Sequence, residues 1–205
     1  MILETLPVGP YETNCYIYAA AQGSSAVAID PGYDSALILR RAKSLTLDIS
    51  YIILTHGHPD HIGALRELKE ATGADIAMHA ADTDLLQDDF LATMLGMSVS
   101  WPPRPDVLLE DGQEIAVGGL TLTVLHTPGH SRGSLCLLGE CVVFTGDTLF
   151  RSGIGRTDLP GGNYREILKS IQTKLMSLPE DAKVYPGHGL PTTVGREKYH
   201  NPFLR

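Results

Sequence analysis

Residues 55–61 read Thr-His-Gly-His-Pro-Asp-His, so three histidines and one aspartate fall within six residues. The spacing offers two pairs of metal ligands from one loop, enough for one segment to serve two neighbouring ions. An apolar, β-rich run (51–54) precedes the segment, and a stretch with helical periodicity (62–70) follows it. Ligands between a strand and a helix lie where α/β folds place their chemistry. A merely solvated histidine-rich loop is disfavoured, because the rest of the chain supplies further ligands.

Three later turns repeat this local setting. Each is an apolar, strand-like run that ends in a glycine turn carrying one histidine or aspartate. The turns follow runs 120–125, 141–144 and 183–185, and they contribute His130, Asp147 and His188. Together with the first segment they give seven ligand-type residues.

Seven ligands suit a two-metal site in which one carboxylate is shared. We assign them as follows: His56, His58 and His130 to the first metal, Asp60, His61 and His188 to the second, and Asp147 as the bridge. Each metal then keeps an open position for water or substrate, as catalytic zinc sites require. Zinc is the metal expected first, and iron or manganese also suit mixed imidazole and carboxylate ligands.

These motifs, in this order, resemble the metallo-β-lactamase superfamily. Four further stretches resemble its glyoxalase II-like branch, the hydroxyacylglutathione hydrolases: residues 6–17, 28–32, 146–158 and 201–204. The resemblance runs from about residue 2 to 204 and implies a single domain over 1–205. We therefore expect an α/β fold in which two sheets pack face to face with helices outside, a four-layer αββα sandwich.

The expected elements form two halves. Strands are predicted near 2–7, 14–20, 25–29, 51–54, 75–78, 114–117, 120–125, 134–138, 141–144 and 183–185, and helices near 34–45, 62–71 and 163–176. Residues 82–106 join the halves, and three prolines within 102–105 exclude a regular helix or central strand there. This segment is either an ordinary connector or a wall of the active-site cleft, with Met94, Met97 and Trp101 contacting substrate.

The composition and net charge restrict the classes of partner that the protein can bind. At 205 residues, with 43% hydrophobic and 20% charged residues, the chain fits one globular domain. A net charge of −8 argues against nucleic acid or an anionic membrane as partner. Residues 1–7 do not resemble a leader, and no apolar run approaches the roughly 18 residues of a membrane span, so we expect a cytoplasmic protein. A monomer and a homodimer are both compatible with the sequence. Cys15, Cys136 and Cys141 lie in strand-like segments and are expected to be buried and inert.

The expected chemistry is hydrolysis of a small thioester. Two adjacent cations would generate a bridging hydroxide that attacks the carbonyl, with Asp60 and Asp147 orienting this nucleophile as well as binding metal. A thioester suits the site because its leaving group is a thiolate. The pKa of a free thiol is about 8.5, so the thiolate leaves without a strong general acid. The resemblance implies S-D-lactoylglutathione, or a related S-acylglutathione, as substrate.

The chain departs from full-length glyoxalase II in its thiol-binding residues. It ends seventeen residues after His188, without the family's helical C-terminal domain, which implies a compact form. Arg156 and Asp158 stand where the family has a lysine and a tyrosine, and Leu190 replaces an aromatic residue. Arg156 either grips a substrate carboxylate or pairs with Asp158, and the sequence leaves both open.

Three further residues are expected to support the site or its surroundings. We expect His126 to support the ligands from behind and Asp30 to brace the metal loop, although Asp-Pro-Gly is also an ordinary turn. Asn163 is a plausible helix N-cap.

Two other functions compete with the hydrolase. A persulfide dioxygenase of the same fold would need a single iron held by two histidines and one aspartate, which this chain also possesses. A non-enzymatic metal-binding module is disfavoured, because the ligand set is complete and leaves open positions.

Overall fold

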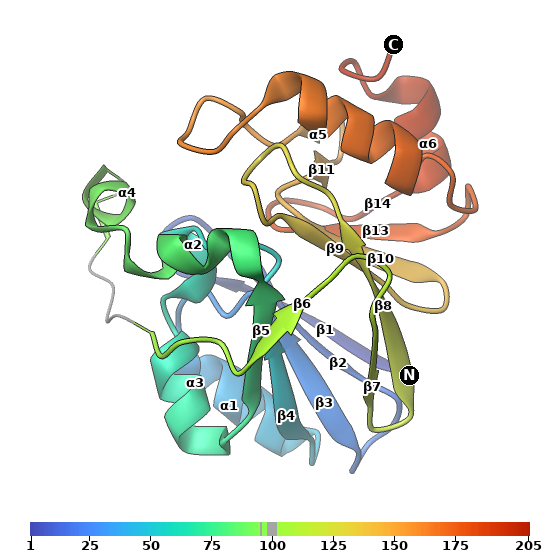
Figure 1. Ribbon diagram of the computed structural model, residues 1–205. Coiled ribbons are helices and arrows are strands. Elements are labelled where there is room, and N and C mark those ends of the chain that lie inside the picture. The colour runs from blue at the N-terminus through green and yellow to red at the C-terminus, as the bar shows by residue number, and fades with distance from the viewer. Residues whose placement is uncertain (95, 98–101) are drawn as a thin grey trace.

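Two six-stranded sheets pack face to face in the computed structural model, which describes residues 1–94, 96–97 and 102–205 (Figure 1). The first sheet contains, in order, β1 (Ile2–Val8), β2 (Thr13–Ala19), β3 (Ser25–Ile29), β4 (Asp48–Ile53), β5 (Asp75–His79) and β6 (Val107–Leu109). The second has the order β14 (Thr192–Thr193), β13 (Lys183–Pro186), β10 (Val142–Gly146), β9 (Leu135–Leu138), β8 (Leu120–His126) and β7 (Glu114–Val117).

Helices cover the outer faces of both sheets. The first sheet packs against α1 (Ser35–Ser44) and α3 (Leu65–Thr72), and the second against α5 (Tyr164–Ser170) and α6 (Val194–His200) (Figure 1). Shorter elements complete the fold: α2 (Pro59–Ile62), the 3₁₀ helix η1 (Ala80–Gln87), α4 (Asp89–Met94), the hairpin β11 (Leu149–Phe150) and β12 (Gly153–Ile154), and a π-helical turn (Ile171–Leu175) that continues α5. The layers confirm the expected αββα sandwich.

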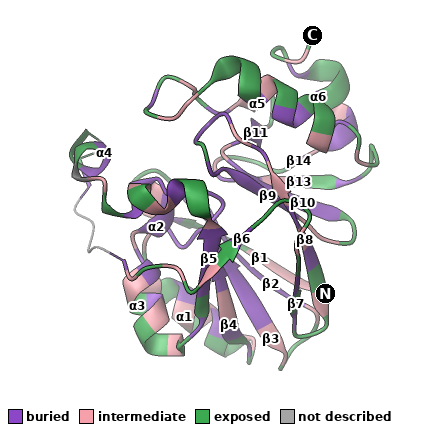
Figure 2. Cartoon of the chain, in the orientation of Figure 1, coloured by how far each residue is buried: buried purple, intermediate pink, exposed green. Residues whose placement is uncertain are grey.

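The core forms three apolar layers, and strand β2 contributes to two of them. Successive side chains of a strand point to opposite faces. Cys15 and Ile17 therefore pack toward α1 and α3, whereas Tyr16 and Tyr18 pack between the sheets. Both tyrosine rings contact Phe144 of β10, with ring centroids 5.1 and 5.3 Å apart. Figure 2 shows the consequence, with buried strands inside and exposed helix faces outside.

Parallel pairing brings the ligand-bearing turns to one edge. Strands β3, β4, β5 and β6 run parallel in the first sheet, as do β10 and β13 in the second. The carboxyl ends of β4, β10 and β13 meet there, as is usual for sites in α/β folds. Backbone bonds link the two sheets at this edge: Leu135 N donates to Thr55 O (2.7 Å), and Asn14 N donates to Gly187 O (2.7 Å).

The predicted elements match the structure except where tertiary contacts intervene. The helix expected over 62–71 is divided into α2 and α3 at Ala64, where the backbone leaves the helical conformation and Ala64 N donates to Pro31 O (3.0 Å) outside the helix. The helix expected over 163–176 is regular only to Ser170. The elements that were not predicted, β6, η1, α4, β11, β12, β14 and α6, are short or polar.

One expectation about side chains needs correction, and a second stays untested. Cys141 is exposed rather than buried, because it lies in the turn before β10 and not within the strand. Of the three side chains suggested to wall the cleft, Met97 is buried, Met94 is exposed, and Trp101 lies outside the described residues. The cleft-wall interpretation of this segment stays a prediction.

No helix among the described residues has both the length and the apolar character needed to cross a membrane.

Candidate metal centre

The structure brings all seven predicted ligands together at one edge of the sandwich. Four come from the turn after β4 and the start of α2, and the turns after β8, β10 and β13 supply one each. Within them, ligand atoms in each of two groups of three lie within 4.8 Å of one another: His56, His58 and His130, and Asp60, His61 and His188. These are the two ligand groups that the sequence predicted.

The first group is a convergence of three imidazoles. His130 Nε2 lies 2.9 Å from His58 Nδ1 and 3.3 Å from His56 Nε2. Burial lowers the pKa of His58 to about 3, and burial together with the neighbouring imidazoles lowers the pKa of His56 well below its usual value. Neutral rings present lone pairs, so this pocket is built to receive a cation rather than to carry one.

The second group combines carboxylates with imidazoles. Asp60 Oδ2 lies 3.2 Å from His188 Nε2 and 3.6 Å from His61 Nε2. Burial alone would raise the pKa of Asp60, but the charge of His61 and a hydrogen bond from His188 outweigh it and lower that pKa. Asp60 is therefore held as a carboxylate.

Asp147 lies between the two groups. Its Oδ2 is 3.7 Å from His130 Nε2 and 3.6 Å from His188 Nε2, and its Oδ1 is 3.4 Å from His61 Nε2. Burial opposes the charge of this carboxylate, yet the positive charge of His61 holds the pKa of Asp147 well below its ordinary value. One carboxylate thus reaches ligand atoms of both groups, as a bridging ligand must.

Three buried polar atoms in this cluster lack a hydrogen-bond partner among the described residues. They are His58 Nε2, His61 Nε2 and Asp147 Oδ1. Buried polar atoms are seldom left unpaired in proteins, so a partner of another kind is implied. Divalent metal ions fit the imidazole and carboxylate donors present.

Hydrogen bonds on the outer ring nitrogens fix the orientation of four histidines. Each Nδ1 donates to an acceptor behind the site: His56 to Thr55 Oγ1 (3.1 Å), His61 to Asp30 Oδ2 (3.0 Å), His130 to Arg156 O (2.8 Å) and His188 to Tyr11 O (3.0 Å). Such partners set the tautomer and aim Nε2 at the centre.

Asp30 braces the metal loop as expected. Besides the bond from His61, its carboxylate accepts hydrogen bonds from the backbone N and the Oγ1 of Thr55, each at 2.7 Å. Asp30 itself adopts a positive φ of 50°, a conformation uncommon outside glycine. The prediction that this residue is more than a turn former is confirmed.

Two other predicted residues lie outside the cluster. Arg156 forms a bidentate ion pair with Asp158, one of the two alternatives that the sequence left open, and substrate binding by Arg156 stays a prediction.

His126 contacts none of the seven predicted ligands in the contacts described. Its Nε2 donates to Arg132 O (2.9 Å), and its ring stacks on His79 with centroids 4.0 Å apart. It supports the loop that carries His130. Asn163 caps α5 as predicted.

Sequence reasoning missed several residues that shape the site. Asn14 Nδ2 donates to Pro186 O (3.0 Å) and Gly189 O (2.9 Å), which holds both ends of the turn bearing His188. Asp82 accepts bonds from two of the ligand loops. A polar side chain within an otherwise buried strand was the available signal for Asn14, whereas nothing marked Asp82 in its polar surroundings.

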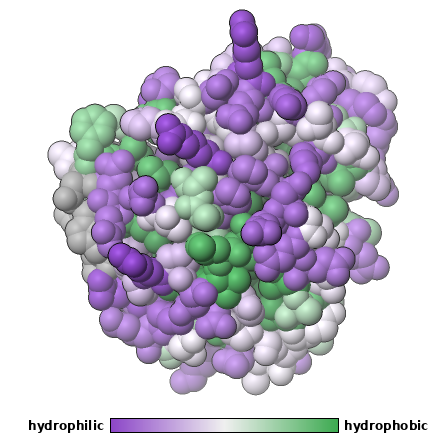
Figure 3. Space-filling model, in the orientation of Figure 1, coloured by the Kyte–Doolittle hydropathy of each residue, from purple (hydrophilic) through white to green (hydrophobic). Residues whose placement is uncertain are grey.

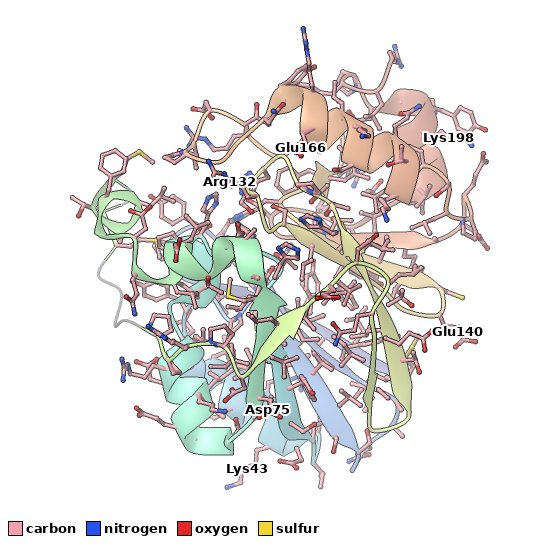
Figure 4. The ribbon with its side chains drawn as sticks, in the orientation of Figure 1. Lys43, Asp75, Arg132, Glu140, Glu166 and Lys198 are labelled. Atoms are coloured by element: carbon pink, nitrogen blue, oxygen red, sulfur yellow. The ribbon has the colours of Figure 1, made fainter. Side chains whose placement is uncertain are left out.

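The surface near the site is mixed in character. Leu190, two residues after His188, is 64% exposed, and Tyr11 is also exposed. Figure 3 shows hydrophobic side chains over β6, where Leu108 is exposed, and over α4. Arg132, two residues after His130, is drawn in Figure 4 on the same side of the molecule as Glu166 of α5.

Comparison with known proteins agrees with this geometry. The chain is 36% identical to the hydroxyacylglutathione hydrolase GloC of Haemophilus influenzae, over 100% of this chain and 98% of GloC. Among solved structures it resembles the B3 metallo-β-lactamase BLEG-1 (37% identity, TM-score 0.93, 99% of both chains). It also resembles TTHA1623 in a di-iron-bound form (37%, 0.89, 98% of this chain and 100% of that one) and ETHE1 from Myxococcus xanthus (33%, 0.83, 98% and 84%).

The model of the metallo-β-lactamase superfamily matches residues 8–188, the span that contains every one of the seven clustered ligands. The chain belongs to the metallo-β-lactamase superfamily.

Proposed function

We propose that this protein is a hydrolase with two divalent metal ions that cleaves a small thioester, with S-D-lactoylglutathione or a related S-acylglutathione as the first candidate. One observation carries the proposal: Asp60, His61 and His188 converge as a complete second ligand group beside the three imidazoles of the first. A single-metal enzyme would have no need of that second group.

The donor set divides into two half-sites that share Asp147. His56, His58 and His130 would hold one ion, and Asp60, His61 and His188 the other. Zinc suits these donors, and the di-iron form of TTHA1623 supports iron as an alternative. Paired cations lower the pKa of water toward neutrality and stabilise negative charge that develops on a carbonyl oxygen.

The chain's own residues would orient the attack. The carboxylates of Asp60, in the second group, and of Asp147, between the two groups, are both held ionised and can accept hydrogen bonds from the attacking water. A thiolate leaving group needs little protonation, which matches a site whose acidic side chains are all held as carboxylates. The resemblance to GloC supports a glutathione thioester in particular.

The decisive experiment is hydrolysis of S-D-lactoylglutathione by protein of measured metal content, with Asp60→Ala in parallel. We expect two ions per chain and turnover in the wild type, and loss of one ion with a fall in kcat of about a hundredfold or more in the variant. Unchanged turnover in Asp60→Ala would overturn the two-metal mechanism. A chromogenic cephalosporin serves as a second substrate, because BLEG-1 is a β-lactamase. Faster cleavage of the cephalosporin than of the thioester would contradict the proposed substrate.

The likeness to ETHE1 keeps the persulfide dioxygenase as the second candidate. It would use one iron and molecular oxygen, and His56, His58, His130 and Asp147 include enough ligands for that ion. One iron per chain, with oxygen consumed on addition of glutathione persulfide and no thioester cleavage, would favour this candidate over the hydrolase.

A further inference from the structure

Asp82 is a buried carboxylate in η1, within the segment that joins the two halves of the chain. Its side chain is 1% exposed and makes no ion pair with lysine or arginine in the described part of the chain. Instead it accepts three hydrogen bonds: from Gly133 N at Oδ1 (2.6 Å), and from Ser131 Oγ (2.6 Å) and Gly57 N (3.3 Å) at Oδ2. Buried polar side chains are retained where hydrogen bonds such as these satisfy them.

The three donors belong to the two loops that carry the first ligand group. Gly57 lies between His56 and His58, and Ser131 directly follows His130. In the contacts described, Asp82 is hydrogen-bonded to none of the predicted ligands. It is bonded instead to residues that directly adjoin each of the three histidines of the first group in sequence. The link spans the two sheets, since one loop follows β4 and the other follows β8.

Close packing makes the link rigid. A Cβ atom added to Gly57 would lie 2.8 Å from the carbonyl oxygen of Asp82, and one added to Gly133 would lie 2.7 Å from Asp82 Cγ. Both separations are too short for real contacts, so glycine is required on both loops for the backbones to approach Asp82. Ser131 Oγ also lies 2.6 Å from Ser134 Oγ, which ties the second loop to itself.

We propose that Asp82 is a positioning residue that sets the separation of His58 from His130 and thereby the affinity and coordination geometry of the first metal half-site. The inference rests on the proposed metal centre. The two ligand nitrogens, 2.9 Å apart, come from two loops, and Asp82 accepts hydrogen bonds from both of them. Partners behind metal ligands typically change metal affinity by about 10–100-fold when removed.

The second half-site has separate anchors, which makes the effect selective. His61 is held by Asp30, and His188 by Tyr11 O, with Asn14 fixing the turn around it. None of these bonds involves Asp82. Loss of the Asp82 carboxylate should therefore weaken the first half-site and leave the second nearly unchanged.

The test measures binding of Co²⁺, whose visible absorption reports coordination geometry, to metal-free protein in two backgrounds. In Asp60→Ala only the first half-site keeps its full group, and in His58→Ala only the second does. Adding Asp82→Asn should lower Co²⁺ affinity about 10–100-fold and alter the spectrum in the first background, with less than about a threefold change in the second. Asp84→Asn, an exposed aspartate of the same 3₁₀ helix, is the matched control and should change neither.

Folding is checked separately. Thermal unfolding of each metal-free variant identifies any that fails to fold, and Ser131→Ala then provides a milder change that removes one bond to Asp82. We expect a smaller loss of Co²⁺ affinity, again confined to the first half-site. Equal losses in both backgrounds, or an unaltered affinity and spectrum in the first, would overturn the positioning role. Failure of the wild type to bind Co²⁺ at all would instead overturn the proposed metal centre itself.

Discussion

Arg156 and Asp158 form a bidentate ion pair, with Nε 2.8 Å from Oδ1 and Nη2 2.7 Å from Oδ2. The pairing occupies the Nε–Nη2 edge of the guanidinium, one of the two edges that can bind a carboxylate bidentately. The carbonyl of Arg156 at the same time accepts the hydrogen bond from His130. We predict that the main contribution of the pair is to this loop and not to substrate binding.

The first prediction follows from this pair. Arg156→Ala should change the KM of S-D-lactoylglutathione by less than about threefold, and it should lower stability little, because solvent screens an exposed ion pair. Steady-state kinetics and urea unfolding measure the two effects. Asp158→Asn, which frees the guanidinium, is the companion variant. A tenfold or larger rise in KM with kcat preserved would show that Arg156 binds the substrate after all.

The second prediction concerns the brace behind the metal loop. Asp30 is buried and accepts three bonds, two from Thr55 and one from His61. In Asp30→Asn an amide NH₂ must face a donor, so we expect a loss of about 1–3 kcal/mol in the unfolding free energy of the metal-free protein. Asp34→Asn changes an aspartate that bonds only Gly9 N at the surface in the contacts described, and it should cost much less. Similar urea midpoints for both variants would refute the brace.

The third prediction separates the cysteines. Burial raises the pKa of the Cys136 thiol to about 12 and that of Cys15 well above its usual value, whereas Cys141 is exposed. Reactivity follows access and thiolate content. One thiol per native chain should react promptly with a chromogenic disulfide reagent, and three should react in denaturant. The native reaction should vanish in Cys141→Ser, and its persistence there would contradict the burial of the other two.

The fourth prediction is a pH dependence of stability. Burial would raise the pKa of Glu197, but hydrogen bonds from Thr192 Oγ1 (2.6 Å), Ser152 N (2.8 Å) and Asn201 Nδ2 (2.9 Å), together with its pairing to Arg196, hold that pKa below its usual value. A carboxylate whose pKa is lower in the folded state stabilises the protein above its unfolded pKa, about 4.3. That stability is lost as the pH falls through the folded pKa.

Glu197→Gln should accordingly be less stable than the wild type at neutral pH, with the difference narrowing as the pH falls below about 4.3. Urea midpoints of metal-free protein across that range give the comparison. The exposed Glu140, labelled in Figure 4, provides the control variant Glu140→Gln. A difference between wild type and Glu197→Gln that stays constant with pH would show that the carboxylate does not titrate as described.

The ligand cluster was predictable because its residues can be recognised from short stretches of the sequence. His56, His58, Asp60 and His61 come from one turn, and apolar runs before His130, Asp147 and His188 showed that each lies at a strand end. The parallel pairing of strands then determines that these ends meet. The layered fold followed from the same runs, since strand periodicity depends only on near neighbours.

Features that depend on distant contacts were not predictable in this way. The exposure of Cys141 depends on where β10 begins, and the pairing partner β13 lies about forty residues further along. Asp82 sits in a run of polar residues with no period, and its role is visible only when Gly57 and Gly133 are brought against it. Strand β6 is three residues long and exists because β5 offers it a free edge. In each case tertiary structure, not local sequence, decides.

The backbone hydrogen bond from Asn14 N to Gly187 O joins β2, near the N-terminus, to the turn after β13. An isolated β-bridge between Thr13 and His188 lies beside it. His188 is the last of the seven predicted ligands to be synthesised. The direction of synthesis therefore completes the first predicted ligand group, His56, His58 and His130, before Asp60 and His61 can meet the third member of the second group.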